Sequence, residues 1–366
     1  MLDDLFWKGL TMKTNILALV IGLWFLTVPS DLARPVFGQE PVAILDAPLT
    51  GHIHPSICRT DGGDLLVVYQ GKNVLMCTRS TDRGDSWTKP EAIPSTAKRP
   101  QGIRESLQRS EVYPGTAGVL PDGRILVTWD FIADAKQDGG YYERVLLYTM
   151  SADDGRTWSD QQIIGPVDGK HLGAIRHNVL PWKDGRWLLP LRSGIPRLFD
   201  PKTRQLQDFP ISSPGSDPGA DPAFQQIIRT AKGTLLAMGR ETLHSSDDGW
   251  TWTVVEGFPV PYDTQDQDFE GRYLTPLADG RVLVTWGVGH QNRGIRYNVS
   301  RDDGRTWDSD QTFVLLPEMD VMARYYSGRT VQIDEHHVGT VFMNRNGLYF
   351  VNWNLKSLAD PELDRR

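Results

Sequence analysis

The chain has 366 residues and a formal net charge of −7 at pH 7, and this length is more than twice the roughly 150 residues usual for one domain. The charge argues against a nucleic-acid partner, which usually binds a basic face. The sequence has no P-loop, dinucleotide-binding fingerprint or H-E-x-x-H motif, and its two cysteines lack metal-site spacing, so we expect no cofactor and no metal.

The first 38 residues have the pattern of an export signal. Lys13 precedes an apolar run at 16–28, small or polar residues follow, and we place the cleavage point after Gly38. The run is short for a membrane-spanning helix, which needs about 20 residues, although a retained anchor is the alternative. We expect a secreted or periplasmic protein with one domain over 39–366 and no other segment that could span a membrane.

Four copies of one pattern, S-x-D-x-G-x-[ST]-W, recur along the chain. They occupy residues 80–87, 151–158, 245–252 and 300–307. In a hairpin turn the Asp accepts hydrogen bonds from backbone N–H groups, the Gly supplies a positive φ, and the Trp gives a small sheet a large apolar contact. Four copies with the same internal spacing indicate an array of similar β units.

A second repeated pattern sets the number of these units. A short turn ending in glycine precedes an apolar strand at Gly62, Gly123, Gly185, Gly233 and Gly280, with a degenerate sixth copy at 336–342 that contains Gly339. The first five glycines are 61, 62, 48 and 47 residues apart, which is typical of four-stranded propeller blades. We therefore expect an all-β, six-bladed β-propeller between about residues 41 and 357, with its first blade at 42–90.

The two cysteines both lie in the predicted first blade. Cys58 and Cys77 could form a disulfide in an exported protein. The alternative, which we favour, is two buried apolar side chains on different strands.

A long acidic loop at 130–140 lies in the predicted second blade. It carries Asp130, Asp134 and Asp138. Hairpin loops usually have two to five residues, and long loops that leave a rigid sheet often carry binding or catalytic groups. A solvated loop is the alternative.

The turn glycines also predict which residues line the propeller axis. Eight residues before each glycine, at the start of the innermost strand, lie His54, Gly115, His177, Gln225 and Arg272, and the corresponding region of the sixth blade is 324–327. Seven residues after each glycine lie Tyr69, Asp130, Arg192, Arg240 and Gly287. A packed core would not favour so many polar side chains. Several converging arginines suit an anionic ligand, because the guanidinium group pairs with a carboxylate through two hydrogen bonds. The alternative is that each Arg pairs with an acidic residue of a neighbouring blade.

With these repeats and pocket residues, the chain resembles the sialidase (neuraminidase) superfamily, also called Asp-box or BNR-repeat proteins. The repeats cover nearly all of the chain after residue 40. The resemblance implies a six-bladed propeller and an exo-glycoside hydrolase. In that family an arginine triad binds the carboxylate of sialic acid, a Tyr with a Glu partner is the nucleophile, and a loop Asp is the acid/base.

Four positions match that scheme. Arg240, downstream of Gln225, resembles one triad Arg, and Arg293, just before the fourth repeat, resembles a second. Tyr326, followed by Ser327, resembles the nucleophile. Asp138 resembles the acid/base, although its loop belongs to the second blade here and follows the first blade in the family.

Two positions depart from the scheme. Gln225 stands where the family has the Glu partner of the nucleophile, and Glu241 or Glu270 is a candidate to replace it. His54 stands where the family has its third Arg, and Arg176 or Arg272 would supply charge instead. Within the superfamily, the segment at 176–178 and the Gln225 blade look more like the BNR-type branch than a typical bacterial sialidase.

We interpret the sequence as an exported sialidase-like hydrolase that releases a terminal sialic or other acidic sugar from a glycan. The expected catalytic residues are Tyr326, Asp138 and Glu270. The expected substrate-binding residues are Arg240, Arg293, Arg272, Arg176, Gln225, His54 and His177. Two alternatives remain: a glycosidase or lyase of the same fold that acts on an uncharged or sulfated sugar, and a glycan-binding propeller without catalysis.

Overall fold

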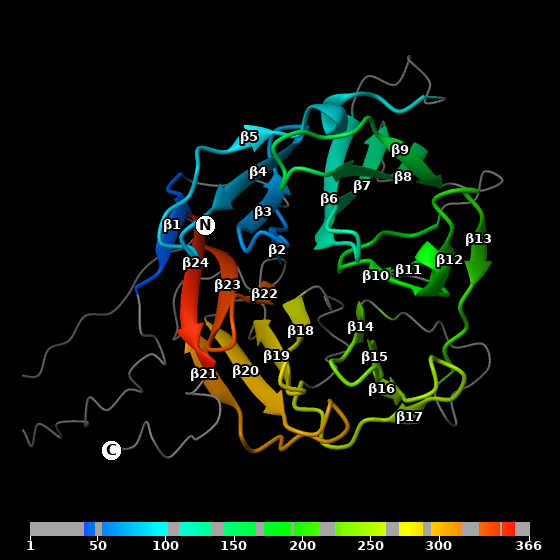
Figure 1. Ribbon diagram of the computed structural model, residues 1–366, viewed down its shortest axis with the longest axis vertical. Helices are drawn as coiled ribbons and strands as arrows, with labels where there is room; N and C mark the ends of the chain where they lie inside the picture. Colours follow the sequence, from blue (N-terminus) through cyan, green and yellow to red (C-terminus); the bar gives the residue numbers. More distant parts are fainter. Residues whose placement is uncertain are drawn as a thin grey trace, which may run out of the picture. The chain divides into compact units, whose positions relative to one another are not determined.

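Six four-stranded antiparallel sheets surround a common axis, and each sheet is one blade of a β-propeller (Figure 1). The computed structural model describes residues 40–47, 53–101, 110–133, 143–165, 172–191, 194–212, 224, 226–260, 271–287, 294–316, 329–344 and 346–355. Contacts divide the chain into Met1–Arg34 and Pro35–Arg366, and every described residue lies in the second unit. The predicted all-β, six-bladed propeller is confirmed.

The strands follow one another around the ring in chain order, from the innermost to the outermost strand of each blade. Blade 1 contains β2 (Ser56–Arg59), β3 (Leu65–Gln70), β4 (Leu75–Ser80) and β5 (Glu91–Ala92). Blade 2 contains β6 (Ser110–Val119), β7 (Ile125–Ala133), β8 (Glu143–Ser151) and β9 (Gln162–Gly165). Blade 3 contains β10 (Leu180–Pro181), β11 (Trp187–Leu189), β12 (Arg197–Phe199) and β13 (Leu206–Asp208). Blade 4 contains β14 (Gln226–Arg229), β15 (Leu235–Met238), β16 (Thr242–Ser245) and β17 (Thr253–Val254).

The remaining blades follow the same order. Blade 5 contains β18 (Arg272–Pro276), β19 (Val282–Gly287), β20 (Ile295–Ser300) and β21 (Phe313–Leu316). Blade 6 contains β22 (Arg329–Gln332), β23 (His337–Asn344), β24 (Gly347–Asn354) and, outermost, β1 (Val42–Leu45). The two short 3₁₀ helices are η1 (Pro94–Ala97) and η2 (Lys183–Gly185). Within the described ranges, no helix is long and apolar enough to cross a membrane.

The first strand closes the ring. β1 pairs with β24, so blade 6 joins the start of the described chain to its end (Figure 1). The sequence interpretation placed residues 42–45 in the first blade, and this was wrong. Periodicity could not reveal it, because the pairing joins positions about 300 residues apart, such as Val42 and Phe350.

Side chains of one blade cover the free inner edge of the next. Gln226 in β14 donates from Nε2 to the carbonyl oxygen of Leu274 (2.8 Å) and accepts from the N–H of Leu274 (2.7 Å). The hydroxyl of Ser56 in β2 accepts from the N–H of Ala117 in β6 (2.9 Å). An unpaired strand edge inside a protein must be hydrogen-bonded, so these polar side chains at the axis have a structural role.

The core lies between the blades. Six clusters of buried apolar side chains each combine residues from two neighbouring blades, so every interface has its own core. Fully buried members include Trp129 of blade 2, Phe199 of blade 3 and Trp353 of blade 6. A blade with two apolar faces must bury both of them, and a closed ring achieves this for all six.

The four repeats share one hydrogen-bond geometry. In the second repeat, Oδ1 of Asp153 accepts from the hydroxyl of Ser151 (2.8 Å) and the N–H of Thr157 (2.8 Å), and its Oδ2 accepts from the Thr157 hydroxyl (2.6 Å). The equivalent aspartates Asp82, Asp247 and Asp302 accept from the corresponding Ser and from the residue four positions on. The spacing of Ser, Asp and Ser or Thr in the pattern therefore follows from the hydrogen bonds that the Asp carboxylate accepts from the residues two positions before and four positions after it.

Each repeat also attaches its blade to the preceding one. In each case the repeat tryptophan lies in the apolar cluster shared with the preceding blade. Trp87 joins blade 1 to blade 6, Trp158 joins blade 2 to blade 1, Trp252 joins blade 4 to blade 3, and Trp307 joins blade 5 to blade 4. The repeat glycine packs against the same neighbour. A Cβ added to Gly155, whose φ is +80°, would lie 2.9 Å from Cδ1 of Leu66 in blade 1. Both the positive φ and this close approach require glycine.

Blade 3 has a shorter turn in place of the repeat. Asp200 accepts from the N–H of Lys202 (2.8 Å) and the hydroxyl of Thr203 (2.9 Å). Arg204, with a φ of 60°, donates from its side chain to the carbonyl oxygen of Ile163 in blade 2 (3.2 Å). This turn therefore also contacts the preceding blade, and the sequence pattern did not identify it.

Two glycine turns differ from the sequence interpretation. In blade 1 the turn glycine is Gly63 and not Gly62, because its N–H donates to the carbonyl oxygen of Thr60 (2.9 Å) as that of Gly123 does to Leu120 (2.9 Å). In blade 6, Gly339 lies within β23 against the ring of Phe350, and the turn precedes His337. The sequence alone could not place these two turns, because blade 1 has two adjacent glycines and the copy in blade 6 departs from the pattern. The hydrogen bonds of the paired strands show where each turn lies.

The two cysteines are free thiols in the core. Cys58 and Cys77 are both buried in the cluster between blades 1 and 2, as we favoured from the sequence. Burial raises the pKa of the Cys58 thiol to about 12, so this thiol stays protonated and unreactive at neutral pH.

The third repeat offers a matched test of the interface role of the tryptophans. Trp252 is 7% exposed and Trp250, two residues earlier, is 87% exposed. We expect Trp252→Ala to lower the free energy of unfolding by about 3–5 kcal/mol, because it leaves a cavity between blades 3 and 4. Trp250→Ala should change it by less than about 0.5 kcal/mol. Urea denaturation followed by circular dichroism measures both, and equal effects would show that the interface contact is not what stabilises the repeat.

The repeat aspartates should make stability depend on acid pH. The side-chain hydrogen bond from Thr251, followed by those from the Thr251 N–H and the Ser245 hydroxyl, lowers the pKa of Asp247 from its ordinary value of 3.8 to about 2. A depressed folded-state pKa contributes stability above the unfolded pKa and loses it as pH falls through the folded value. We expect Asp247→Asn to lower the Tm at pH 7, and the difference from the parent to shrink between about pH 4 and pH 2. A constant difference across that window would contradict the assignment.

Candidate functional site

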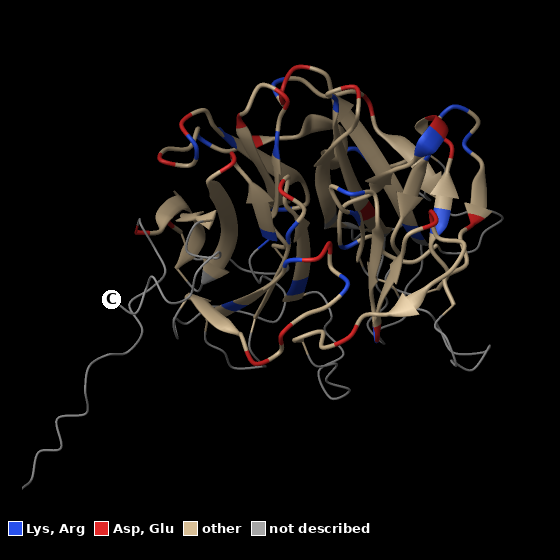
Figure 2. Cartoon of the chain, turned by 60° about the horizontal axis from the view of Figure 1, so that its bottom comes forward, with Lys and Arg blue, Asp and Glu red and all other residues tan. Residues whose placement is uncertain are grey.

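Three buried arginines from different blades meet at one end of the propeller axis. Arg176 precedes β10 of blade 3, Arg272 begins β18 of blade 5, and Arg329 begins β22 of blade 6. They are 3%, 8% and 7% exposed. Figure 2 shows basic positions on strands near the middle of the ring, whereas acidic positions are frequent on the turns around it. We call Arg176, Arg272 and Arg329 the arginine layer.

Hydrogen bonds to backbone carbonyls hold two of these arginines across blades. Arg329 donates from Nη2 to the carbonyl oxygen of Arg176, and Arg272 donates from Nη2 to that of Gly239 in blade 4 (3.2 Å). Arg176 also lies over the ring of Tyr113 in blade 2, 5.5 Å from its centroid. The guanidinium groups are therefore oriented before any ligand binds.

A buried carboxylate joins the arginine layer to blade 2. Oδ2 of Asp130 in β7 accepts from Nη1 of Arg176 (3.1 Å) and from Nη2 of Arg144 in β8 (2.7 Å). Asp130 is 0% exposed. Asp130 and Arg144 lie in two strands that pair as far as Ala133 and Glu143. Asp130 therefore connects β7 and β8 of blade 2 to Arg176 of blade 3. The predicted loop at 130–140 was wrong in its first four residues, because strand pairing extends β7 through 130–133.

His177 lies inside the arginine layer as a neutral imidazole. Its ring stacks on Tyr273, with centroids 5.7 Å apart and planes inclined by 29°. Burial, followed by the positive charges of Arg329, Arg272 and Arg176, holds the pKa of His177 well below its usual value of 6.5. All three arginines therefore raise the electrostatic potential at this ring, and a positive potential favours a bound anion.

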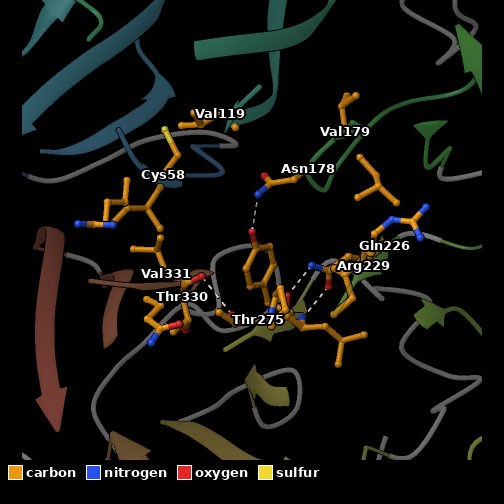
Figure 3. A pocket seen from close by; sticks show the side chains of 18 of the residues that line it. Cys58, Val119, Asn178, Val179, Gln226, Arg229, Thr275, Thr330 and Val331 are labelled. Atoms are coloured by element: carbon orange, nitrogen blue, oxygen red, sulfur yellow. Dashed lines mark hydrogen bonds between the residues drawn. The ribbon is translucent and has the colours of Figure 1, made fainter. Parts of the chain in front are cut away.

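A cavity lies along the axis next to this layer. It has a volume of about 330 Å³, and the innermost strands of all six blades line it (Figure 3). Among its lining residues, Asn178, Leu274 and Val331 closely follow Arg176, Arg272 and Arg329 in the chain. Figure 3 shows Asn178 pointing inward, where its Nδ2 donates to the hydroxyl of Tyr273 (2.9 Å). Tyr273 therefore lines the cavity and also stacks on His177 in the arginine layer.

The structure places several of the predicted residues near one another. Arg176 and Arg272 both lie close enough to His177 to lower its pKa, and their role in substrate binding stays a prediction. Arg240 is exposed on the turn whose Gly239 accepts from Arg272, so it lies beside the layer. His54 is buried with a φ of 38° just before β2. Its position is one residue earlier than the turn of blade 1 requires, because Gly63 is the turn glycine there.

Five predicted site residues lie outside the described residues. They are Asp138, Gln225, Glu270, Arg293 and Tyr326. Their roles remain predictions from the sequence.

Sequence reasoning missed three residues of this region: Arg329, Tyr273 and Asn178. Arg329 escaped because the sequence interpretation placed the corresponding region of the sixth blade at 324–327, whereas β22 begins at Arg329. Tyr273 and Asn178 each follow a predicted position by one residue, so the signal was present beside Arg272 and His177. Among the described residues, no group of three or more His, Cys, Asp or Glu side chains is placed to hold a metal ion.

Solved structures with the same fold include sialidases. An intramolecular trans-sialidase from Ruminococcus gnavus, solved with oseltamivir carboxylate, is 15% identical, with a TM-score of 0.56 over 88% of this chain and 98% of that one. The Hadza microbial sialidase Hz136 is 19% identical, with a TM-score of 0.55 over 83% of this chain and 66% of that one. A Dyadobacter fermentans protein of unknown function is 18% identical, with a TM-score of 0.56 over 86% and 97%.

These similarities show a sialidase-like six-bladed propeller. At such low identity they establish the fold and not the activity. No family model matches the sequence, and no curated protein matches it.

The role of Asp130 can be tested by stability. Asp130→Asn keeps the side-chain shape but removes the charge that faces Arg144 and Arg176, so we expect the free energy of unfolding to fall by about 3–5 kcal/mol. The matched control is Asp122→Asn, which removes the partner of Arg124 in an exposed pair (2.8 Å) and should change stability by less than about 1 kcal/mol. Chemical denaturation of both variants measures the difference. An Asp130 variant as stable as the control would contradict a structural role for this carboxylate.

Proposed function

We propose that this protein is an exported exo-glycoside hydrolase that releases a terminal acidic sugar, such as sialic acid, from a glycan. The observation that carries the proposal is the convergence of Arg176, Arg272 and Arg329 on one buried, neutral histidine at the propeller axis. Oriented guanidinium groups bind a carboxylate more strongly than a neutral group, and more strongly in a buried site than in water. The sialidase-like fold supports the same reading by analogy.

In this proposal the chain's own residues divide the chemistry. The arginine layer, with Arg240 and Arg293, holds the carboxylate of the substrate. Asp138 donates a proton to the leaving glycosidic oxygen while the phenolic oxygen of Tyr326 attacks the anomeric carbon. A phenol suits this position because a carboxylate nucleophile would be repelled by the carboxylate of the substrate.

The tyrosine requires a neighbouring base. The free pKa of Tyr is about 10, so a group near Tyr326 must accept its proton, and Glu270 is our candidate. Water then attacks the same carbon with Asp138, now ionised, as the base, which releases the sugar and returns the proton to the enzyme. The first 38 residues direct the protein out of the cytoplasm in this proposal.

The proposal is tested by release of fluorophore from a fluorogenic α-sialoside and a fluorogenic β-glucuronide. We expect the parent to hydrolyse at least one of them. Asp138→Asn should lower kcat by roughly 10²–10⁴-fold, which is typical of a lost general acid, and Tyr326→Phe should abolish turnover.

The matched control is Tyr349→Phe in β24, the third strand from the axis of blade 6, which should keep parental activity. A parent that is folded but hydrolyses neither substrate would contradict the proposed activity. Retained turnover in Tyr326→Phe would remove that residue from the mechanism.

A further inference from the structure

His177 has an unusual environment for a fully buried side chain. It is 1% exposed, and, within the described part of the chain, neither Nδ1 nor Nε2 has a hydrogen-bond partner. Buried polar groups are nearly always hydrogen-bonded, and leaving one without a partner is unfavourable. The stacking of this ring on Tyr273 does not offset that, because a phenylalanine would keep the stack without burying two nitrogens.

The charge state of His177 defines what it can bind. In the neutral form one ring nitrogen is a donor and the other an acceptor. Three arginines surround this ring and disfavour its protonation. His177 is thus not suited to bind the anionic group itself, which pairs better with the guanidinium groups. It is suited to a group that can both donate and accept, and a hydroxyl is such a group.

We propose that His177 is a specificity-determining residue that hydrogen-bonds a hydroxyl group of the ligand next to the anionic group held by the arginine layer. The inference rests on the proposed function, and it narrows the ligand class. The site then selects a small hydroxylated acid, such as an acidic sugar, over an inorganic anion that has no hydroxyl and over a neutral sugar that has no charge.

The test compares four probes by titration calorimetry with the full-length protein: N-acetylneuraminate, D-glucuronate, methyl β-D-glucoside and sulfate. We expect the parent to bind at least one acidic sugar more tightly than it binds sulfate or the glucoside. His177→Phe should weaken that acidic sugar roughly tenfold, the value of one hydrogen bond, and leave sulfate affinity within about twofold. Its Tm should equal or exceed that of the parent, because the variant removes two unpaired buried nitrogens.

Two further variants keep the result interpretable. His177→Gln retains a neutral donor and acceptor, so it should preserve more acidic-sugar affinity than His177→Phe. His244→Phe makes the same substitution in β16, away from the axis, and should bind every probe as the parent does.

The inference is overturned if His177→Phe binds the acidic sugar as tightly as the parent, if sulfate affinity falls equally, or if the parent binds neither acidic sugar. If the parent hydrolyses its substrate and His177→Phe binds the acidic sugar with the affinity of the parent, only the role of His177 is contradicted. A parent that neither binds nor hydrolyses an acidic sugar removes the proposed function as well.

Discussion

Contact between each blade and the preceding one is the interaction on which this structure depends. A single four-stranded blade cannot bury its two apolar faces by itself, and the chain provides a core only between neighbours. In the repeat turns, a few neighbouring residues make this contact between blades. Their Asp closes the turn, their Gly permits close approach, and their Trp enters the adjoining core. Blade 3 makes a similar contact with a different turn, so the repeat motif is not the only turn that joins one blade to the preceding one among the described residues.

Closure of the ring then determines what meets at the axis. The innermost strands all begin at the same end, so their first residues approach one another although they are far apart in the chain. The bond from Arg329 to the carbonyl of Arg176 joins blades 6 and 3, and Asp130 joins blade 2 to the same arginine. These contacts fix the guanidinium groups rather than leaving them as flexible surface charges. A site built on rigid strands in this way loses little conformational freedom when a ligand binds.

Polar groups at two levels of the axis differ in how they are hydrogen-bonded. Along the inner edges, side chains such as Gln226 satisfy the backbone of the next blade in full. At the arginine layer, charges are buried and His177 keeps two ring nitrogens without partners among the described residues. Natural proteins depart from complete polar satisfaction mainly where function requires it. The buried charges and the ring nitrogens of His177, unpaired within the described structure, are the basis for the proposed ligand with an anionic group and a hydroxyl.

The sequence by itself determined the class of fold, the number of blades and the role of the repeats. These follow from local rules: turn chemistry acts over four residues, and strand periodicity acts over two. The sequence also singled out His177 and Arg272, because a fixed distance from a turn glycine is a local property, and the family resemblance added Arg176. Only the tertiary structure decided that β1 belongs to blade 6, that Gly63 and not Gly62 is the turn glycine, and that Arg329 joins the site. The choice of Gly63 over Gly62 depends on a hydrogen bond within the turn, which two adjacent glycines in a sequence do not reveal. The place of β1 and the contact of Arg329 with Arg176 depend on positions far apart in the chain. The same reason explains Asp130. Its type and position were visible in the sequence, but Arg144 and Arg176, which share its carboxylate, lie on blades 2 and 3 and meet only when these two blades pack together.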